Sequence, residues 1–139
     1  MVEYKASLKL KIPRQDNIMG LSWESYEVIN CNYTFNKKTN HEGEVCSSLR
    51  GGLINLELSD LPTDNLMGWV FDHAKRYNGE ITIFDTDQET IEQIYFEDAR
   101  CIDFRLCYKA DKKPHTSTNI ILATSKLQIG DVHYENLNR

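Results

Sequence analysis

Leu49-Arg50-Gly51-Gly52-Leu53-Ile54-Asn55-Leu56 is the stretch around which the rest of the chain is organised. Paired glycines allow the backbone to bend sharply or to pass close to another backbone. The apolar residues after them alternate with other residues, as in a β-strand. The stretch therefore predicts a corner between a loop and a strand. A second interpretation is a corner that contacts another subunit, because the charge of Arg50 is either solvated or aimed at an acid elsewhere.

The composition is that of an ordinary soluble globular protein. The chain has 139 residues, of which 40% are hydrophobic and 27% are charged. A chain of this length can form one domain with a sizeable core, so we expect a single domain over residues 1–139. The net charge of −5 argues against nucleic acid as a partner, because binding to phosphates needs a basic patch.

The sequence predicts no membrane insertion. No apolar run approaches the roughly 20 residues that span a bilayer, and the N-terminus lacks the apolar core of a signal peptide. We therefore expect cytoplasmic synthesis, with export only by a machine that needs no signal peptide. The cysteines lack the C-x-x-C spacing of zinc and redox sites and are expected to be free thiols. They are Cys31, Cys46, Cys101 and Cys107.

Alternation of apolar and polar residues predicts several strands. It is clearest over residues 2–12, where three lysines share the polar face. We interpret Lys5, Lys9 and Lys11 as solvated side chains that discourage edge pairing. The alternative is the basic side of an interface with an acidic neighbour. Further strands are expected over residues 26–35, 54–58, 81–83, 91–108, 121–129 and 132–134.

Two of the remaining segments carry specific expectations. In 91–108 the even-numbered positions are apolar except at Asp98 and Arg100, which predicts a bend or a bulge there. Residues 36–48 form a long polar segment without helical periodicity, and loops of that length are usually functional or disordered.

One helix is expected, over about residues 64–77. Thr63 or Asp64 can cap its N-terminus, and Gly79 fits the position just after its end. Trp69 is expected to anchor the helix to the sheet. The order of strands, one helix and more strands predicts a mostly β fold, a small antiparallel barrel or sandwich with one flanking helix.

The sequence offers little for catalysis. It has no G-x-S-x-G nucleophile motif. His133 with Glu135 is only a weak metal signal. Glu97 and Asp98 are adjacent on a strand and point to opposite faces, so they cannot readily act on one atom. We therefore expect no enzyme activity, no metal and no cofactor. The histidines, which lie in no recognisable motif, are His41, His73, His115 and His133.

Six short motifs, in a consistent order and spacing, resemble one family. They are C-N-Y-T-F (31–35), S-S-L-R-G-G-L-I-N-L (47–56), L-M-G-W-V (66–70), G-E-I-T-I-F (79–84), F-E-D-A-R-C (96–101) and S-K-L-Q-I-G-D-V-H-Y-E-N (125–136). Together they resemble the haemolysin-coregulated protein (Hcp) family in its Bacteroidetes form. These are the tube proteins of type VI secretion. The resemblance covers nearly the whole chain after residue 25 and includes the first strand.

The resemblance implies a small β-barrel with one flanking helix and no catalytic site. It also implies hexameric rings that stack into a hollow tube inside a contractile sheath, with effectors carried in the lumen. The partners would be other copies of the chain, the sheath, spike and baseplate proteins, and secreted effectors. The loop at 36–48 matches the family's long loop that reaches a neighbouring subunit or ring. The expected subunit or ring contacts are Lys37, Lys38, His41, Glu42, Glu44, Arg50, Gly51, Gly52, Glu97 and Asp98.

Two features depart from the family pattern. Residues 13–25 are longer than the expected hairpin, and Val45 stands where a proline is common. Two alternatives from other classes stay open. A monomeric β-barrel that binds a small ligand or peptide predicts an internal apolar cavity. A hydrolase that uses one of the cysteines or a metal is ranked last.

Overall fold

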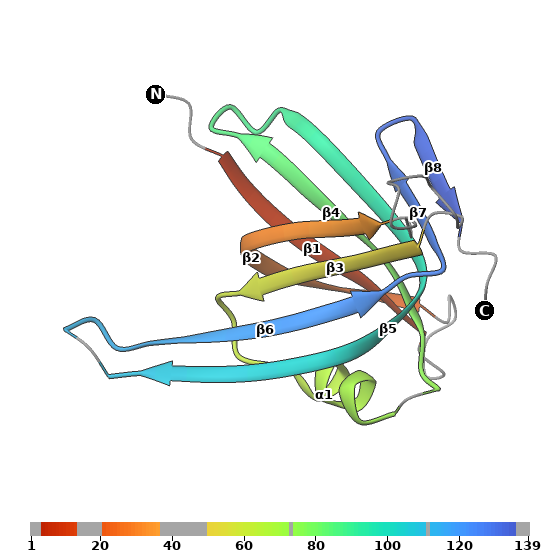
Figure 1. Ribbon diagram of the computed structural model, residues 1–139. Helices are drawn as coiled ribbons and strands as arrows, with labels where there is room; N and C mark the ends of the chain where they lie inside the picture. Colours follow the sequence, from red (N-terminus) through yellow and green to blue (C-terminus); the bar gives the residue numbers. More distant parts are fainter. Residues whose placement is uncertain (1–3, 14–20, 37–49, 73, 111, 136–139) are drawn as a thin grey trace, which may run out of the picture.

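The computed structural model describes residues 4–13, 21–36, 50–72, 74–110 and 112–135. Within these residues the chain forms eight β-strands and one α-helix (Figure 1). The mostly β fold with one helix that the sequence predicts is therefore confirmed. In chain order the elements are β1 (Tyr4–Pro13), β2 (Leu21–Asn36), β3 (Arg50–Leu58), α1 (Asp64–Phe71), β4 (Tyr77–Asp85), β5 (Thr90–Lys109), β6 (His115–Ala123), β7 (Lys126–Ile129) and β8 (Val132–Glu135).

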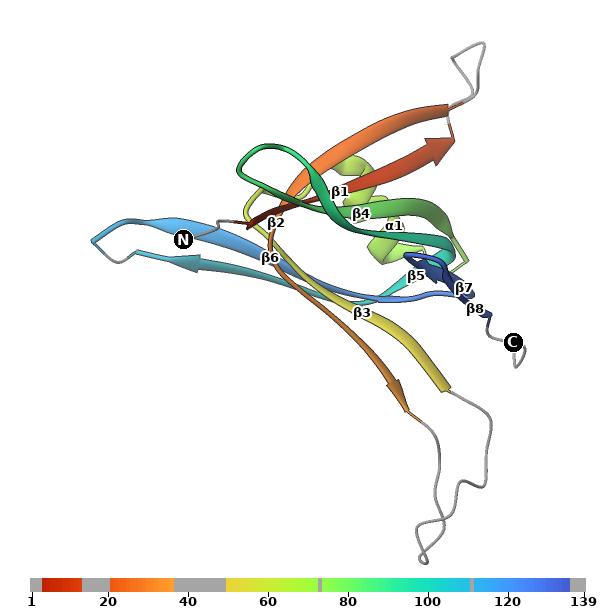
Figure 2. The same ribbon diagram turned by 90° about the horizontal axis from the view of Figure 1, so that it is seen from above.

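The strands form one antiparallel sheet that closes on itself. Its order is β4-β1-β2-β3-β6-β5-β7-β8, and β4 also pairs with β5. The first six strands of this order therefore make a barrel, and β7 and β8 form a hairpin beside β5. The β2–β3 pair and the β5–β6 pair extend out of the barrel as two arms that point in different directions (Figure 2). The sheet thus consists of a closed barrel and of two strand pairs, β2–β3 and β5–β6, that continue beyond the barrel.

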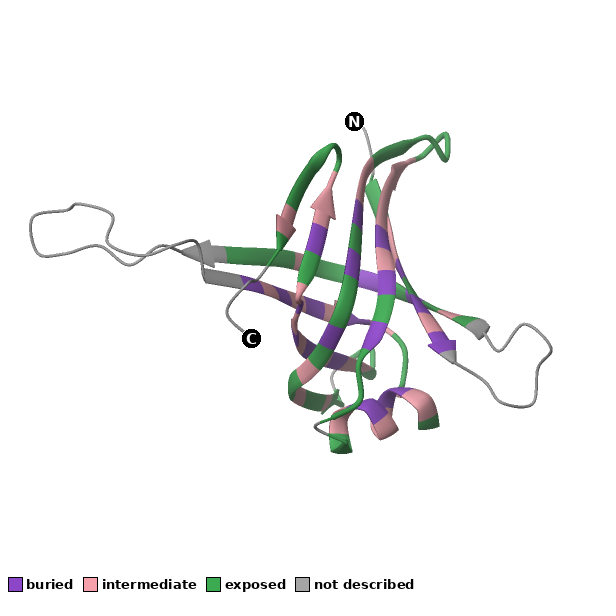
Figure 3. Cartoon of the chain, turned by 90° about the vertical axis from the view of Figure 1, so that its right-hand side faces the viewer, coloured by how far each residue is buried: buried purple, intermediate pink, exposed green. Residues whose placement is uncertain are grey.

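Alternating apolar side chains fill the barrel. On β1, Leu8 and Leu10 are fully buried whereas Lys5 and Lys9 are exposed, as the period of two predicts. Figure 3 shows the same alternation along the other strands. Burial of each large side chain contributes about 1.5–3 kcal/mol, so this core is the main source of stability. The largest fully buried side chains are Trp69, Tyr77, Phe96, Leu8, Leu10, Ile54, Leu58, Leu66, Ile81, Ile94, Ile120 and Leu122.

The bulge predicted in β5 is present at Asp98. The pairing of β5 with β4 shifts between Phe96 and Ala99, and Asp98 has a φ of 53°. The extra residue moves the core-facing position from even to odd numbers, so Phe96 and Ala99 are both buried. Asp98 therefore interrupts the apolar face without entering the core.

A second bulge in β5 was not predicted. The pairing with β6 shifts between Cys101 and Asp103, which leaves Ile102 as the extra residue. The core-facing position returns to even numbers beyond it, where Phe104 packs against the core. The two extra residues thus change the core-facing side of β5 twice, and only the first change was predicted.

The helix is shorter than expected. It spans Asp64–Phe71 instead of about 64–77, and Thr63 is its N-cap. Asp72 has an extended backbone (φ −106°, ψ 103°) that ends the helix. Tyr77 then starts β4, and its ring lies 4.9 Å from that of Trp69. Packing of Tyr77 onto the helix needs the chain to turn back early, which overrides the helical spacing of the sequence.

Two further details of the packing differ from or confirm the sequence pattern. Gly79 lies within β4 and is not a helix end. A Cβ there would meet the carbonyl oxygen of Lys9 and the Phe96 ring, each at 2.6 Å, so the strand needs a glycine at this close approach. Trp69 anchors the helix to the sheet as predicted, because it is fully buried and its Nε1 donates to the Ala99 carbonyl at 3.0 Å.

The strand predicted over residues 121–129 is two strands. β6 ends at Ala123 and β7 begins at Lys126. Ile120 and Leu122 face the core, rather than the odd-numbered positions, and Leu127 takes up the inward face in β7. The break lets β6 and β7 pair with successive parts of β5 on either side of the Asp98 bulge.

Candidate assembly surfaces

The glycine corner at the start of β3 is a sharp bend, as the sequence predicts. Gly52 has a φ of 73°, in the region that favours glycine. It is the extra residue where the β2–β3 register shifts between Thr34 and Phe35. The Gly52 carbonyl accepts hydrogen bonds from the Thr124 backbone N–H at 3.1 Å and the Thr124 hydroxyl at 3.0 Å. The corner is thus tied to the end of β6.

Glu97 and Asp98 lie on the other side of the same link. The Ser125 N–H donates to the Glu97 carbonyl at 3.2 Å, and the Ser125 hydroxyl donates to the Asp98 carbonyl at 3.4 Å. Both acids are exposed. Thr124 and Ser125 therefore join the glycine corner to the β5 bulge. Nothing in the sequence indicates this role for the two residues, because a Thr-Ser pair next to a strand carries no recognisable signal.

The predicted contact residues fall into two groups, one within the described part of the chain and one outside it. Arg50 and Gly51 belong to β3, where their backbones pair with Asn36 and Phe35. The structure places Gly52, Glu97 and Asp98 around the 124–125 link. The predicted contacts that fall outside the described residues are Lys37, Lys38, His41, Glu42 and Glu44.

Four of the six barrel strands, β2, β3, β6 and β5, form a continuous sheet with regular rows. One row runs through Cys31, Leu56, Ile120 and Phe104 on β2, β3, β6 and β5. The next row runs through Asn32, Asn55, Ile121 and Asp103. The first row faces the core and the second row faces away from it, because successive residues alternate.

Both outer edges of this four-stranded sheet are open in the described chain. β2 pairs with β1 only as far as Val28, and beyond that residue it pairs with β3 alone. β5 pairs with β4 only as far as Ala99, and from Arg100 onward it pairs with β6 alone. An exposed strand edge of this length carries unpaired backbone groups that readily pair with another chain.

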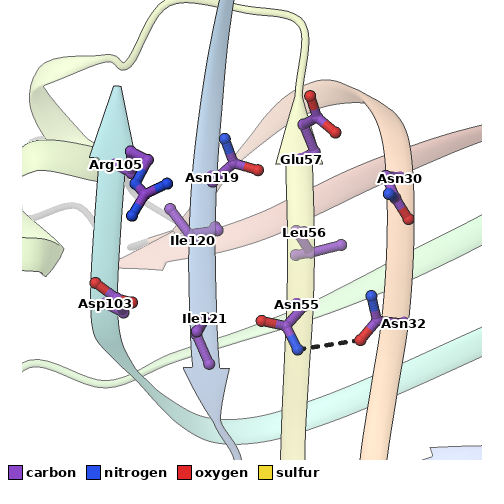
Figure 4. Close-up of a pocket in the computed structure, with 10 residues that line it drawn as sticks. All are labelled: Asn30, Asn32, Asn55, Leu56, Glu57, Asp103, Arg105, Asn119, Ile120 and Ile121. Atoms are coloured by element: carbon purple, nitrogen blue, oxygen red, sulfur yellow. Dashed lines mark hydrogen bonds between the residues drawn. The ribbon is translucent and has the colours of Figure 1, made fainter. Parts of the chain in front are cut away.

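The face directed away from the core is polar and hollowed. A groove of about 260 Å³ crosses the four strands, and Figure 4 shows its side chains. Four of the ten are asparagines, and Asn55 donates to the side-chain oxygen of Asn32 at 3.0 Å. The lining residues are Asn30, Asn32, Asn55, Leu56, Glu57, Asp103, Arg105, Asn119, Ile120 and Ile121. Four amides and three charged side chains, Glu57, Asp103 and Arg105, therefore make this face polar.

The core-facing side of the open edges is apolar and incompletely covered. Leu106 and Tyr108 on β5 are 49% and 65% exposed, and Tyr33 on β2 is 43% exposed. These residues continue the inward face of the sheet past the point where β1 and β4 cover it. Large apolar side chains at an open edge are typical of an interaction surface.

Two of the described thiols, those of Cys31 and Cys101, are poor nucleophiles. Burial raises the pKa of the Cys101 thiol to about 11, and burial also raises that of Cys31. The reactive thiolate is therefore scarce at neutral pH. In the described chain, no group of three or more His, Cys, Asp and Glu side chains is placed to hold a metal ion. The helical part of the described chain is also too short and too polar to cross a membrane.

The described fold defines a class of proteins found in contractile injection systems. It is similar to Hcp1 from Flavobacterium johnsoniae, with 19% identity, a TM-score of 0.78, and coverage of 95% of this chain and 99% of that one. It is similar to Hcp1 from Salmonella typhimurium (11% identity, TM-score 0.62, 91% and 85% covered). A chain of the sheath–tube complex of the extracellular contractile injection system PVC is also similar (11% identity, TM-score 0.51, 94% and 89% covered).

The sequence itself places the chain within this class. The family model for hemolysin coregulated protein Hcp (TssD) matches residues 2–137, and the chain belongs to this family. The likeness to the Flavobacterium protein supports the Bacteroidetes form that the motifs indicate. A search of curated proteins found no match. The chain is therefore a member of the Hcp tube-protein family of type VI secretion.

Proposed function

We propose that this chain is a structural subunit of the type VI secretion inner tube. Copies form closed six-subunit rings, and the rings stack into a hollow tube that carries effectors. The observation that supports this most directly is the four-stranded sheet with two open edges. Within the described residues this sheet leaves both outer edges without a strand partner, so it offers one edge to each of two neighbours.

Strand direction makes the two edges compatible with each other. The strands alternate in direction across β2, β3, β6 and β5. Rotation about a ring axis keeps each strand's direction, so β5 of one copy runs antiparallel to β2 of the next. The sheet then continues from copy to copy without a break. A head-to-tail contact of this kind closes into a ring when the rotation allows it.

The arrangement of the elements also supports a lumen lined by the polar face. β1, β4 and α1 lie on the core side of the four-stranded sheet (Figures 1 and 2). That bulk has room only on the outside of a ring, so the amide-lined groove faces the hole. Effectors would pass this wall, while the sheath would surround the other side. Spike and baseplate proteins would meet the ends of the tube.

The role is structural and involves no catalysis or cofactor. The whole chain acts as one tube-protein domain, made in the cytoplasm and exported by type VI secretion without a signal peptide. Neighbouring subunits or rings meet the glycine corner and the loop before it. The proposed contacts are Lys37, Lys38, His41, Glu42, Glu44, Arg50, Gly51, Gly52, Glu97 and Asp98.

Native mass spectrometry with negative-stain microscopy tests this function. We expect six-subunit rings at micromolar concentrations of the wild-type chain, and stacks of rings as the concentration rises. A strictly monomeric species up to millimolar concentration would contradict the proposal. It would instead favour the monomeric binding barrel, although the barrel interior is filled by large side chains such as Leu10 and Phe96.

A further inference from the structure

Each open edge consists of a bulge followed by a regular run. On β2 the extra residue is Ile29, and residues 30–36 follow it without a further insertion on that strand. On β5 the extra residue is Ile102, and residues 103–109 follow it in unbroken register with β6. The two runs have the same length. A bulge disrupts the ladder beside it, so a ladder between copies would use the two regular runs.

The faces of the two strands restrict how these runs can align. Phe104, Leu106 and Tyr108 share the core-facing side of β5, and Cys31 and Tyr33 share that side of β2. Core-facing residues of one copy must oppose core-facing residues of the next, or apolar side chains would enter the polar lumen. A slip of one residue is therefore excluded, and allowed registers differ by two residues.

We propose that the two runs pair over their full length, with Leu106 opposite Tyr33 of the next copy. This register rests on the proposed ring. It joins two partly exposed apolar side chains, 49% and 43% exposed in the isolated chain, on the core side. On the lumen side it places Cys107 opposite Asn32 and Arg105 opposite Thr34. Shorter alignments leave backbone groups of one run without partners.

The geometry of closed barrels gives an independent check. Within one copy, a straight row runs from Cys31 on β2 to Phe104 on β5. In the proposed register Phe104 opposes residue 35 of the next copy, so crossing four strands advances the chain by four residues. With about 3.4 Å per residue and about 4.8 Å between strands, the strands tilt by about 35°. Closed barrels usually tilt by about 35–45°.

The neighbouring registers give strand tilts outside that range. Alignment without any offset gives no tilt, and an offset of two residues gives a tilt of about 20°. An offset of six gives a tilt of about 47° and shortens the ladder at both ends. The full-length register therefore gives both the most backbone pairing and an ordinary barrel tilt. Ladder length and strand tilt are independent criteria, and they select the same register.

Cysteine cross-linking tests the register with single substitutions. Cys107 is a free thiol on the lumen side of β5. Asn30, Asn32 and Thr34 share the lumen side of β2 and are all exposed. Asn30→Cys, Asn32→Cys and Thr34→Cys therefore report three adjacent allowed registers against the same native partner. Asn32 and Cys107 are separated by β3 and β6 within one chain, so a disulfide between them must join two copies.

We expect assembled Asn32→Cys protein to give a ladder of covalent oligomers on mild oxidation. Peptide mass spectrometry would identify the 32–107 link, and adding Cys107→Ala would abolish it. Asn30→Cys and Thr34→Cys, 7–8 Å away on the diagonal, should link at least about 10-fold more slowly, because a disulfide needs closer Cβ atoms. Arg105→Cys with Thr34→Cys, in a Cys107→Ala chain, reports the same register if Asn32→Cys does not fold.

The outcomes separate the register from the function. Intact rings that link fastest through Asn30→Cys or Thr34→Cys, or that link through none of these pairs, would overturn the register and leave the ring standing. Absence of rings before oxidation, in the wild-type chain as well, would overturn the proposed function together with the register.

Discussion

At the residue scale, the glycine corner shows how one position sets the course of a strand. Gly52 adopts a left-handed φ and accepts two hydrogen bonds from Thr124. Its α-carbon also lies against the last strand, since a Cβ there would meet Tyr134 Cε1 at 2.8 Å. Both conformational freedom and close packing therefore require glycine at this position.

Gly52→Ala should destabilise the fold. The positive φ costs an L-residue about 1–2 kcal/mol, and displacement of Tyr134 adds to that. We expect the free energy of unfolding to fall by about 2–3 kcal/mol, measured by chemical denaturation. Gly68→Ala is the control. It lies within α1 with only Lys75 Nζ near its Cβ, at 3.7 Å, and should be neutral or stabilise by up to about 1 kcal/mol. Equal losses from both would contradict this view.

At the element scale, α1 is fixed by a hydrogen-bond network at its start. Thr63 accepts from the Leu66 N–H at 3.2 Å as the N-cap. The Glu24 carboxylate on β2 accepts from the hydroxyls of Thr63 and Tyr26, and from Asn65 Nδ2 at 2.7 Å. Burial, followed by this carboxylate, raises the pKa of Tyr26 well above its ordinary value. The network ties the helix to the closed part of the barrel.

Thr63→Ala should loosen this attachment. It removes the cap and one donor to Glu24, so we expect a loss of about 1–2 kcal/mol in the free energy of unfolding. Thermal and chemical unfolding followed by circular dichroism measure it. Thr86→Ala is a matched control, because Thr86 is exposed in the β4–β5 turn and its loss should stay within about 0.5 kcal/mol. A Thr63→Ala variant as stable as that control would mean that Trp69 packing alone holds the helix.

At the scale of the whole molecule, the two halves of β5 differ in their pairing. The first half of β5 pairs with β4 and closes the barrel. The second half pairs with β6 along one edge, and its other edge is open in the described chain. In this second half Leu106 and Tyr108 are 49% and 65% exposed in the described chain. The fold therefore uses the first half of β5, and the proposed ring contact uses the second half.

Leu106→Glu should separate assembly from folding. Leu106 is 49% exposed, so the fold should lose less than about 1 kcal/mol. A charge at the proposed interface should instead remove rings from the native mass spectrum and leave monomers. Ile91→Glu is the control, since Ile91 is 53% exposed in the paired half of the same strand, and its rings should persist. Rings that survive Leu106→Glu would show that this edge lies outside the contact.

The sequence predicted much of the local structure correctly, for a physical reason. Alternation over residues 4–12, the bend at Gly52, the cap at Thr63 and the bulge at Asp98 each depend on a few neighbouring residues. Their backbone geometry follows from side-chain volume, φ preference and local hydrogen bonds. Motif order also indicated the family, which the family model confirms.

Tertiary contacts decided what the sequence could not. The helix ends early because Tyr77 packs on Trp69. The strand predicted over residues 121–129 breaks into β6 and β7, so that Thr124 and Ser125 can bond Gly52 and the β5 bulge. Closure of β4 onto β5, and the two edges that closure leaves open, depend on pairings between residues far apart in the chain. Alternation shows only that a strand has a buried face. Which strand pairs with it, and whether a second strand pairs with its other edge, is decided when the whole sheet packs around its core.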